Sequence, residues 1–299
     1  MQVTVATAQY PITYHHDFQS WKAHVTAWVE KAVEQNAHLL LFPEYGAMEL
    51  VSIFDKAIHA DIEQQIVQLD TLLQDFCSVW AELARLYNVV IVAPSIPVFE
   101  NGVPVNRVFV FAERGLVGYQ DKFFMTRFEN EIWGIRSGEK VLSVFEAGWG
   151  SFGIQICYDV EFPIGTHLLS QNGATLVLAP SCTETIRGAT RVHVGARARA
   201  MENQLYTIVS QTVNDALWSP VVDINYGYSA VYSTADMQLP EEGIVDIQPA
   251  QSEGWLVTSL DMSLLAQVRE NGQVFNYKDS CQVNMLLNNE KIRIKKYQI

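Results

Sequence analysis

The chain has 299 residues, of which 49% are hydrophobic and 18% are charged, a composition typical of a well-packed globular protein. Its formal net charge of −13 argues against general binding of nucleic acid or anionic membranes, because phosphate contacts need clustered cations. No run approaches the ~20 apolar residues of a membrane span, and the first residues lack the basic and apolar regions of a secretion signal. We therefore expect a soluble, cytoplasmic protein that does not bind membranes.

The cysteines are too widely spaced to indicate a shared structural role. Four are present and no two form a CxxC pair, so their spacing predicts neither a disulfide framework nor a zinc site. We expect the chain to use neither a metal nor a cofactor. The four are Cys77, Cys157, Cys182 and Cys281.

The first half of the chain alternates predicted strands and helices. Alternating apolar residues predict a strand over residues 2–8, with a break at 9–11. Asp17 can cap a helix that reaches about Asn36, and a longer helical stretch runs from about 61 to 87. Apolar runs bounded by turn residues predict further strands at 38–42, 89–93, 105–111 and 116–119, the last two as a hairpin.

The second half continues the same alternation without an internal boundary. Helices are predicted at 163–171, 190–203 and 262–269, and strands at 141–146, 151–156, 174–179, 205–211, 228–233, 243–247 and 255–260. Because no linker, repeat or low-complexity segment divides the chain, we expect one α/β domain over residues 1–299 with a mixed sheet. Residues from about 271 onward form an expected C-terminal extension, an interface or a tail, with a basic segment at 291–296.

The segment 151–163 carries the strongest functional signal. Its first half predicts a buried strand, Cys157 follows directly, and Pro163 suits the first turn of a helix. Cys157 is thus predicted at a strand-to-helix elbow, where the following backbone N–H groups are free to hold an oxyanion. The alternative is a packing role, since free cysteines are usually buried.

Two more ionisable residues, Glu44 and Lys122, follow predicted strands in the same way. Either alone is more typical of a solvated surface. Together with Cys157 they supply what amide hydrolysis requires: a thiol nucleophile, a carboxylate that moves its proton, and a cation for the oxyanion. The N–H of Tyr158 is a second predicted oxyanion donor. No histidine stands beside a plausible nucleophile, which argues against a Cys-His protease.

These three residues resemble the Glu-Lys-Cys triad of the carbon–nitrogen hydrolase (nitrilase) superfamily. Four motifs carry the resemblance, in order LFPE at 41–44, DK at 121–122 with Glu129 seven residues on, GIQICYDVEFP at 153–163 and ARAMENQ at 198–204. The resemblance implies a four-layer α-β-β-α sandwich that assembles as a homodimer or larger homo-oligomer. It also implies that Glu129 is a second active-site glutamate, which hydrogen-bonds the lysine or positions substrate and water.

The nucleophile is followed by Tyr158-Asp159, where true nitrilases tend to have Trp-Glu. This difference favours an amidase or N-carbamoyl amidohydrolase that forms an acyl-enzyme thioester. The alternatives are a nitrilase that acts through a thioimidate, and a non-catalytic binding module that retains the fold. The expected partner is a small amide, carbamoyl or nitrile compound.

Several further residues are candidates for lining the substrate pocket. Tyr158, Trp133 and Ser181 are predicted to bind substrate, and Cys182 to line the pocket or play a structural part. Arg187 and Arg191 could bind a substrate carboxylate, with surface salt bridges as the alternative. Other candidates for the pocket mouth, each of which could equally belong to the core, are Tyr45, Phe128 and Trp218.

Overall fold

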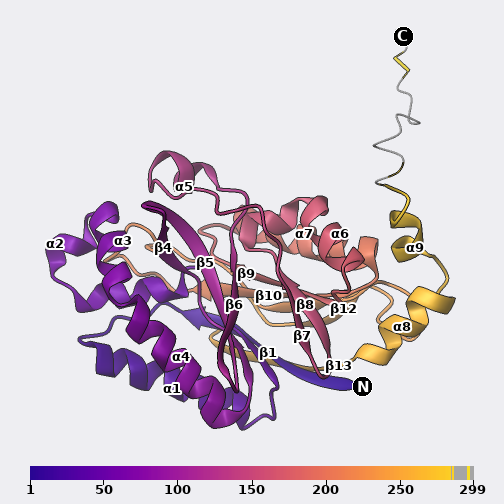
Figure 1. Cartoon of the computed structure of the whole chain (residues 1–299), viewed down its shortest axis with the longest axis horizontal. Helices are drawn as coiled ribbons and strands as arrows, with labels where there is room; N and C mark the ends of the chain where they lie inside the picture. Colours follow the sequence, from indigo (N-terminus) through magenta and orange to yellow (C-terminus); the bar gives the residue numbers. More distant parts are fainter. Residues whose placement is uncertain (284, 286–294, 297–299) are drawn as a thin grey trace.

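The computed structural model in Figure 1 describes residues 1–283, 285, 295 and 296. Most of the basic segment predicted at 291–296 therefore lies outside the described residues, as does much of the expected C-terminal extension. Within the described part of the chain, no helix is long and apolar enough to cross a membrane.

The helices and strands alternate along the chain much as predicted. The first half contains β1 Gln2–Pro11, α1 Phe18–Val33, β2 Leu39–Leu41, the 3₁₀ helix η1 Gly46–Ile53, α2 Lys56–His59, α3 Ile62–Thr71, α4 Leu73–Tyr87, β3 Val90–Val92, β4 Ile96–Glu100, β5 Val103–Ala112 and β6 Gly115–Asp121. The second half contains α5 Arg127–Glu131, β7 Val144–Ala147, β8 Gly150–Ile154, the 3₁₀ helix η2 Cys157–Glu161, α6 Pro163–Gln171, β9 Leu176–Ser181, α7 Ile186–Asn203, β10 Tyr206–Val213, β11 Ala230–Tyr232, β12 Ile244–Ile247, β13 Gly254–Asp261, α8 Met262–Asn271 and α9 Asn276–Ser280.

The strands form one mixed sheet in which the central strands are parallel. Its main path runs β4-β5-β3-β2-β1-β10-β9-β8-β7, and β1, β2, β3, β8, β9 and β10 all point the same way. Strand β6 is antiparallel to β5, which is antiparallel to β3, so β6 shares the direction of the parallel set. The carboxyl ends of β2, β6, β8 and β9 therefore face the same way, as sites in α/β proteins require.

Side chains on the two faces of β1, β2, β3 and β9 enter different cores. Along β1, Val3 and Val5 belong to an inner cluster, whereas Ala8 and Tyr10 pack with α1 and α4. The inner cluster also contains inward-facing residues of β8 and β9, so the two halves of the curled sheet pack face to face. Helices α1 and α4 cover one half, and α6 and α7 lie on the other side of the molecule (Figure 1). This arrangement confirms the expected four-layer α-β-β-α sandwich.

The main differences from the sequence-based predictions concern the ends of elements and short helices. Strand β1 continues through Pro11 where a break was expected, because Gln9 to Pro11 pair with residues 211–213 of β10. The predicted helix at 61–87 is divided at Leu72 into α3 and α4. The strand β4 and the short helices η1, α2, α5, η2 and α9 were not predicted. Asp17 caps α1, and α6 begins at Pro163, both as predicted.

Candidate active site

Cys157 occupies the predicted turn between β8 and the helices that follow. Its backbone has φ of +48°, in the left-handed region that non-glycine residues enter at a cost of about 1–2 kcal/mol. It opens η2, which precedes α6, so the elbow contains an extra 3₁₀ turn. The thiol is buried, and its Sγ lies 3.7 Å from the carbonyl oxygen of Cys182 at the end of β9.

Lys122 lies between two carboxylates. Its Nζ is 2.7 Å from Oε1 of Glu44, 2.8 Å from Oε1 of Glu129 and 2.7 Å from Oε2 of Glu129. All three side chains are only 1% exposed. Buried charges persist only when they are paired and hydrogen-bonded, so this cluster is a cooperative unit in which one cation serves two acids.

The carboxylate of Glu44 is held from both sides. Oε1 also accepts a hydrogen bond from Nδ2 of Asn106 at 2.9 Å, and Oε2 accepts the backbone N–H of Cys182 at 3.0 Å. Burial raises the pKa of Glu44 to about 7, with a further increase from the charge of Glu129 and an opposing effect of Lys122. A carboxyl group with this pKa can both accept and return a proton near neutral pH.

Glu129 has the opposite electrostatic setting. Burial alone raises its pKa, but the Lys122 ammonium and several hydrogen bonds outweigh burial, so the pKa is lowered overall. Tyr45 donates its hydroxyl to Oε1 at 2.7 Å, and both the N–H and the hydroxyl of Thr126 donate to Oε2 at 2.8 Å. Glu129 therefore stays ionised as the fixed counterion of Lys122, while Glu44 is free to change its protonation state.

The thiol of Cys157 needs such a base. Burial raises its pKa well above the usual value, the negative charge of Glu44 adds to the increase, and Lys122 opposes it. The resting sulfur is therefore a protonated thiol, whereas a good nucleophile is the thiolate. The arrangement can produce thiolate during reaction if Glu44 takes the proton.

Asp159 also belongs to the site, although the sequence patterns did not assign it a functional role. Its carboxylate accepts the backbone N–H groups of Phe123, at 3.1 and 3.2 Å, and of Phe124, at 2.8 Å. These bonds join the segment after Lys122 to η2, which begins at Cys157. Burial raises the pKa of Asp159 to about 6. Its place two residues after the nucleophile was the available signal.

A cavity of about 450 Å³ opens onto the Glu44, Lys122, Cys157 and Glu129 side chains. Other residues of its lining include several predicted candidates: Tyr45, Phe128, Trp133, Tyr158, Cys182 and Arg191. Trp218 instead packs edge-on against Tyr14 and near His59. Arg187 is not among the lining residues.

The placement of Ser181 in the pocket is a correction. Strand β9 extends two residues past its predicted end and includes Ser181, which is fully buried beside Gln211 of β10. The Ser181 hydroxyl donates to the carbonyl of Ala179 at 3.1 Å. The next residue, Cys182, lines the cavity in its place.

The backbone of Cys182 contacts both Cys157 and Glu44. Its carbonyl accepts a hydrogen bond from the Cys157 thiol, and its N–H donates one to the Glu44 carboxylate. Its own thiol has a pKa raised to about 12, mainly by burial. Cys182 therefore helps to fix the positions of Cys157 and Glu44 through its backbone.

Comparison with known proteins shows which family the chain resembles along most of its length. The sequence matches the carbon–nitrogen hydrolase family over residues 4–270. It is similar to a probable hydrolase from Bacillus subtilis, with 31% identity over 277 residues that cover 93% of this chain and 53% of that protein. The chain thus spans about half the length of this relative. An omega-amidase from Saccharomyces cerevisiae is 30% identical over 133 residues, or 44% of this chain and 42% of that enzyme.

A solved structure shares the fold across nearly its full length. It is a variant of the amidase from Nesterenkonia sp. AN1 with the acetamide moiety of fluoroacetamide added covalently at the active-site cysteine. It aligns with a TM-score of 0.72 at 20% identity and covers 96% of each chain. The family match extends from β1 to the end of α8 and includes all the residues around the cavity. The chain therefore belongs to the carbon–nitrogen hydrolase family.

Proposed function

We propose that this chain is a cysteine-dependent hydrolase of carbon–nitrogen bonds in small non-peptide amides. The observation that carries the proposal is the meeting of Cys157, Glu44 and Lys122 in one cavity, with a second glutamate as counterion of the lysine. Each group has the electrostatic setting that its part in amide hydrolysis requires. The amidase names among the relatives support the same reaction class.

The first half of the reaction forms a thioester. Glu44 takes the proton of the Cys157 thiol as Sγ attacks the carbonyl carbon, and the C=O electron pair moves onto oxygen. The Lys122 ammonium and the N–H of Tyr158 hold that oxyanion. When the tetrahedral intermediate collapses, Glu44 gives its proton to the leaving nitrogen, the C–N bond breaks, and ammonia or an amine departs.

The second half restores the thiol. Glu44, again ionised, takes a proton from water as the water oxygen attacks the thioester carbonyl, and the same donors hold the second oxyanion. Collapse breaks the C–S bond, releases a carboxylic acid or a carbamic acid, and the proton on Glu44 returns to sulfur. Glu129 keeps Lys122 charged and fixed through both halves.

The proposed substrates are small amides or N-carbamoyl compounds, because a cavity of about 450 Å³ admits a compact ligand only. Arg191 at the wall offers a partner for a substrate carboxylate, which suits the omega-amidase among the relatives. A nitrile would instead form a thioimidate with Cys157. A binding module that retains the fold would turn over none of these compounds.

The first test is ammonia release from a panel of small amides, N-carbamoyl amino acids and nitriles. We expect release from amides or carbamoyl compounds that disappears in Cys157→Ala. Cys281→Ala is the matched control, because Cys281 is exposed and not among the cavity-lining residues. Turnover of nitriles alone would support the nitrilase alternative. No ammonia release from any compound of the panel would favour the non-catalytic binding module. Activity that survives Cys157→Ala would refute the proposed nucleophile.

Glu44→Gln tests the proposed base separately. The amide retains the shape of the side chain but cannot take a proton, so we expect kcat/KM to fall by about 10²–10⁴. Glu82→Gln, which alters an exposed carboxylate paired with Lys22, should leave the rate unchanged. Circular dichroism checks that both variants keep the fold. A Glu44→Gln variant with full activity would show that another group moves the proton.

We also propose that residues 1–299 act as one domain and assemble as a homodimer or larger homo-oligomer. Exposed apolar side chains on α6 and α7 support this assembly, since such side chains gather where another surface covers them. Light scattering on the purified protein measures the assembly directly. The residues concerned are Ile164, Leu168, Ile186, Val194 and Met201.

A further inference from the structure

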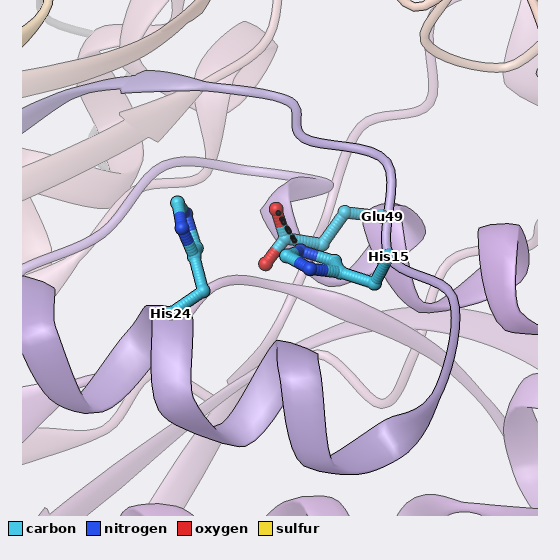
Figure 2. Close-up of side chains that lie close together, drawn as sticks. All are labelled: His15, His24 and Glu49. Atoms are coloured by element: carbon cyan, nitrogen blue, oxygen red, sulfur yellow. Dashed lines mark ion pairs between the residues drawn. The ribbon is translucent and has the colours of Figure 1, made fainter.

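A second cluster of potential ligands lies outside the active-site cavity. His15 follows β1, His24 projects from α1, and Glu49 lies on η1 (Figure 2). One donor atom from each of these side chains lies within 4.8 Å of the donors from the other two. His15 is 4% exposed and Glu49 is 1% exposed, and His24 is partly buried.

Two imidazole nitrogens in this cluster, Nε2 of His15 and Nε2 of His24, are buried and have no hydrogen-bond partner among the described residues. Nε2 of His15 is 3.5 Å from Oε2 of Glu49, close enough for the ion pair drawn in Figure 2 but without hydrogen-bond geometry. Buried nitrogens normally have a partner. Two such nitrogens in one cluster with a buried carboxylate indicate that a cationic partner is missing.

Glu49 also needs positive charge beside it. Its carboxylate receives one strong neutral hydrogen bond, from the Tyr10 hydroxyl to Oε1 at 2.7 Å, and a weak one from the N–H of Thr13 at 3.4 Å. A fully buried carboxylate without a cation is costly. The His15 ring lies 3.5 Å from Oε2 of Glu49 but makes no hydrogen bond to it.

A divalent transition metal satisfies all three groups together. Two imidazoles and one carboxylate form the donor set of zinc sites that keep an open fourth position. Zinc would draw the three donors from their present spacing to about 3.4 Å from one another, as bonds of about 2.0–2.2 Å require. Tyr10 already orients the carboxylate, as outer hydrogen-bond partners do at metal sites.

A cavity borders the cluster on the side of His24. His24 lines a cavity of about 500 Å³, whose wall also contains the carboxylates of Asp215 and Glu253 and the cation of Lys31. Acidic walls attract cations.

We propose that His15, His24 and Glu49 form a binding site for a divalent transition metal, with zinc the ion that suits the donors best. The metal would join the loop after β1 to α1 and η1. Because η1 starts directly after Glu44-Tyr45, the site would stabilise the segment that carries the proposed base. The site is distinct from the proposed thiol chemistry and does not depend on it.

Zinc binding to the full chain tests the proposal. The protein is freed of metal with a chelator and titrated with Zn²⁺ by calorimetry, in both the wild type and the Cys157→Ala variant, so that the active-site thiol is controlled. We expect one equivalent per chain, submicromolar affinity in both proteins, and a rise in Tm. Co²⁺ should give visible d–d absorption without the near-ultraviolet bands of a thiolate complex.

Two variants and one control decide whether these residues are the ligands. His24→Gln and Glu49→Gln should each weaken Zn²⁺ binding by at least ~100-fold and abolish the Tm shift. His16→Gln changes an exposed neighbouring histidine and should bind as the wild type does. Circular dichroism of His24→Gln, at a partly buried position, verifies folding. Absence of binding in the wild type, or binding that survives both ligand substitutions, would overturn the proposal.

Discussion

The Nζ atom of Lys122 lies 2.7 Å from Oε1 of Glu44, and neither side chain is more than 1% exposed. The same ammonium also contacts both oxygens of Glu129. One positive charge therefore serves two buried acids, and the two acids respond differently. The pKa of Glu129 is lowered whereas that of Glu44 is raised to about 7, so the shared cation leaves one of the pair ready to exchange a proton.

Lys122→Met should destabilise the protein strongly at pH 7. The substitution leaves Glu44 and Glu129 buried without a cation, and removing one partner of a buried pair typically costs about 3–5 kcal/mol. We expect the loss in the free energy of unfolding, measured in urea, to shrink as the pH falls. In the variant, Glu44 and Glu129 remain buried without the Lys122 ammonium that lowers their pKa values. As the pH falls, these two carboxylates therefore take up protons in the folded state, which removes the unpaired charge.

Lys22→Met is the control for this measurement. Lys22 pairs with Glu82 at 2.8 Å, but both side chains are well exposed, so its removal should change stability little at any pH. A loss for Lys122→Met that is equally small, or independent of pH, would contradict the view that Lys122 neutralises the two acids.

Glu129→Gln should move the pH dependence of activity. If Glu44 must be ionised to accept the thiol proton, kcat/KM of the wild type rises with pH through about 7. The negative charge of Glu129 raises the pKa of Glu44, so its removal lowers that pKa. We expect the acidic limb of the profile to move to lower pH, together with a fall in the maximum rate because Lys122 loses a partner.

The profile of Glu131→Gln serves as the comparison. Glu131 lies on the same short helix, α5, but is exposed and pairs with Arg127. Its profile should coincide with that of the wild type. If the acidic limb of the pH–activity profile did not move in Glu129→Gln, a group other than Glu44 would control the loss of activity at low pH.

The sequence predicted that Glu44, Lys122 and Cys157 would lie close together, and the structure places them around one cavity. Glu44, Lys122 and Cys157 each stand just after a predicted strand, and parallel strands bring such positions to one edge. The sequence pattern did not predict where β9 ends, because pairing with β10 extends the strand to Ser181. Period-2 alternation indicates that a strand exists but fixes its last residue poorly.

The sequence pattern did not predict the short helix α5 or the cluster of His15, His24 and Glu49, for a different reason in each case. The helix α5 has only five residues, too few to show helical periodicity, although Thr126-x-x-Glu129 is a capping-box signature that could have revealed it. The cluster of His15, His24 and Glu49 has no sequence spacing to recognise. It comes from a loop, a helix and a 3₁₀ helix that only the folded chain brings together.

Arg191→Met should distinguish substrates that carry a carboxylate from neutral amides. Arg191 lines the cavity, and its only ion-pair partner among the described residues is Glu161, at 3.4 Å. If its guanidinium binds a substrate carboxylate, the variant should raise KM for amides of dicarboxylic acids by about tenfold or more, since charged hydrogen bonds contribute about 1.5–3 kcal/mol. Neutral amides should be almost unaffected.

Arg187→Met provides the matched control on the same helix, α7, because Arg187 does not line the cavity. Its KM values should equal those of the wild type for both substrate types. Equal effects of Arg191→Met on charged and neutral amides would assign Arg191 to the structural pair with Glu161 instead.

Gly195→Ala should damage the site from outside the cavity. A Cβ atom at Gly195 would lie 2.9 Å from the carbonyl oxygen of Val160 and 3.2 Å from Cα of Glu161. Both are backbone atoms of η2, which cannot rotate away as a side chain can, so α7 and η2 must separate. Because η2 begins at Cys157, the separation should shift Sγ relative to Glu44. We expect a lower kcat and a loss of about 1–3 kcal/mol in stability, as overpacking usually causes.

Gly148→Ala separates this effect from a general cost of replacing glycine. A Cβ at Gly148, in the exposed turn between β7 and β8, meets no atom of the described part of the chain within 4 Å. Its kcat and its unfolding midpoint should match those of the wild type. In Gly195→Ala, thiol labelling of Cys157 should change along with kcat, since the position of the sulfur is what the contact controls. Unchanged kcat and labelling despite a lower unfolding midpoint would mean that η2 keeps its place without close packing against α7.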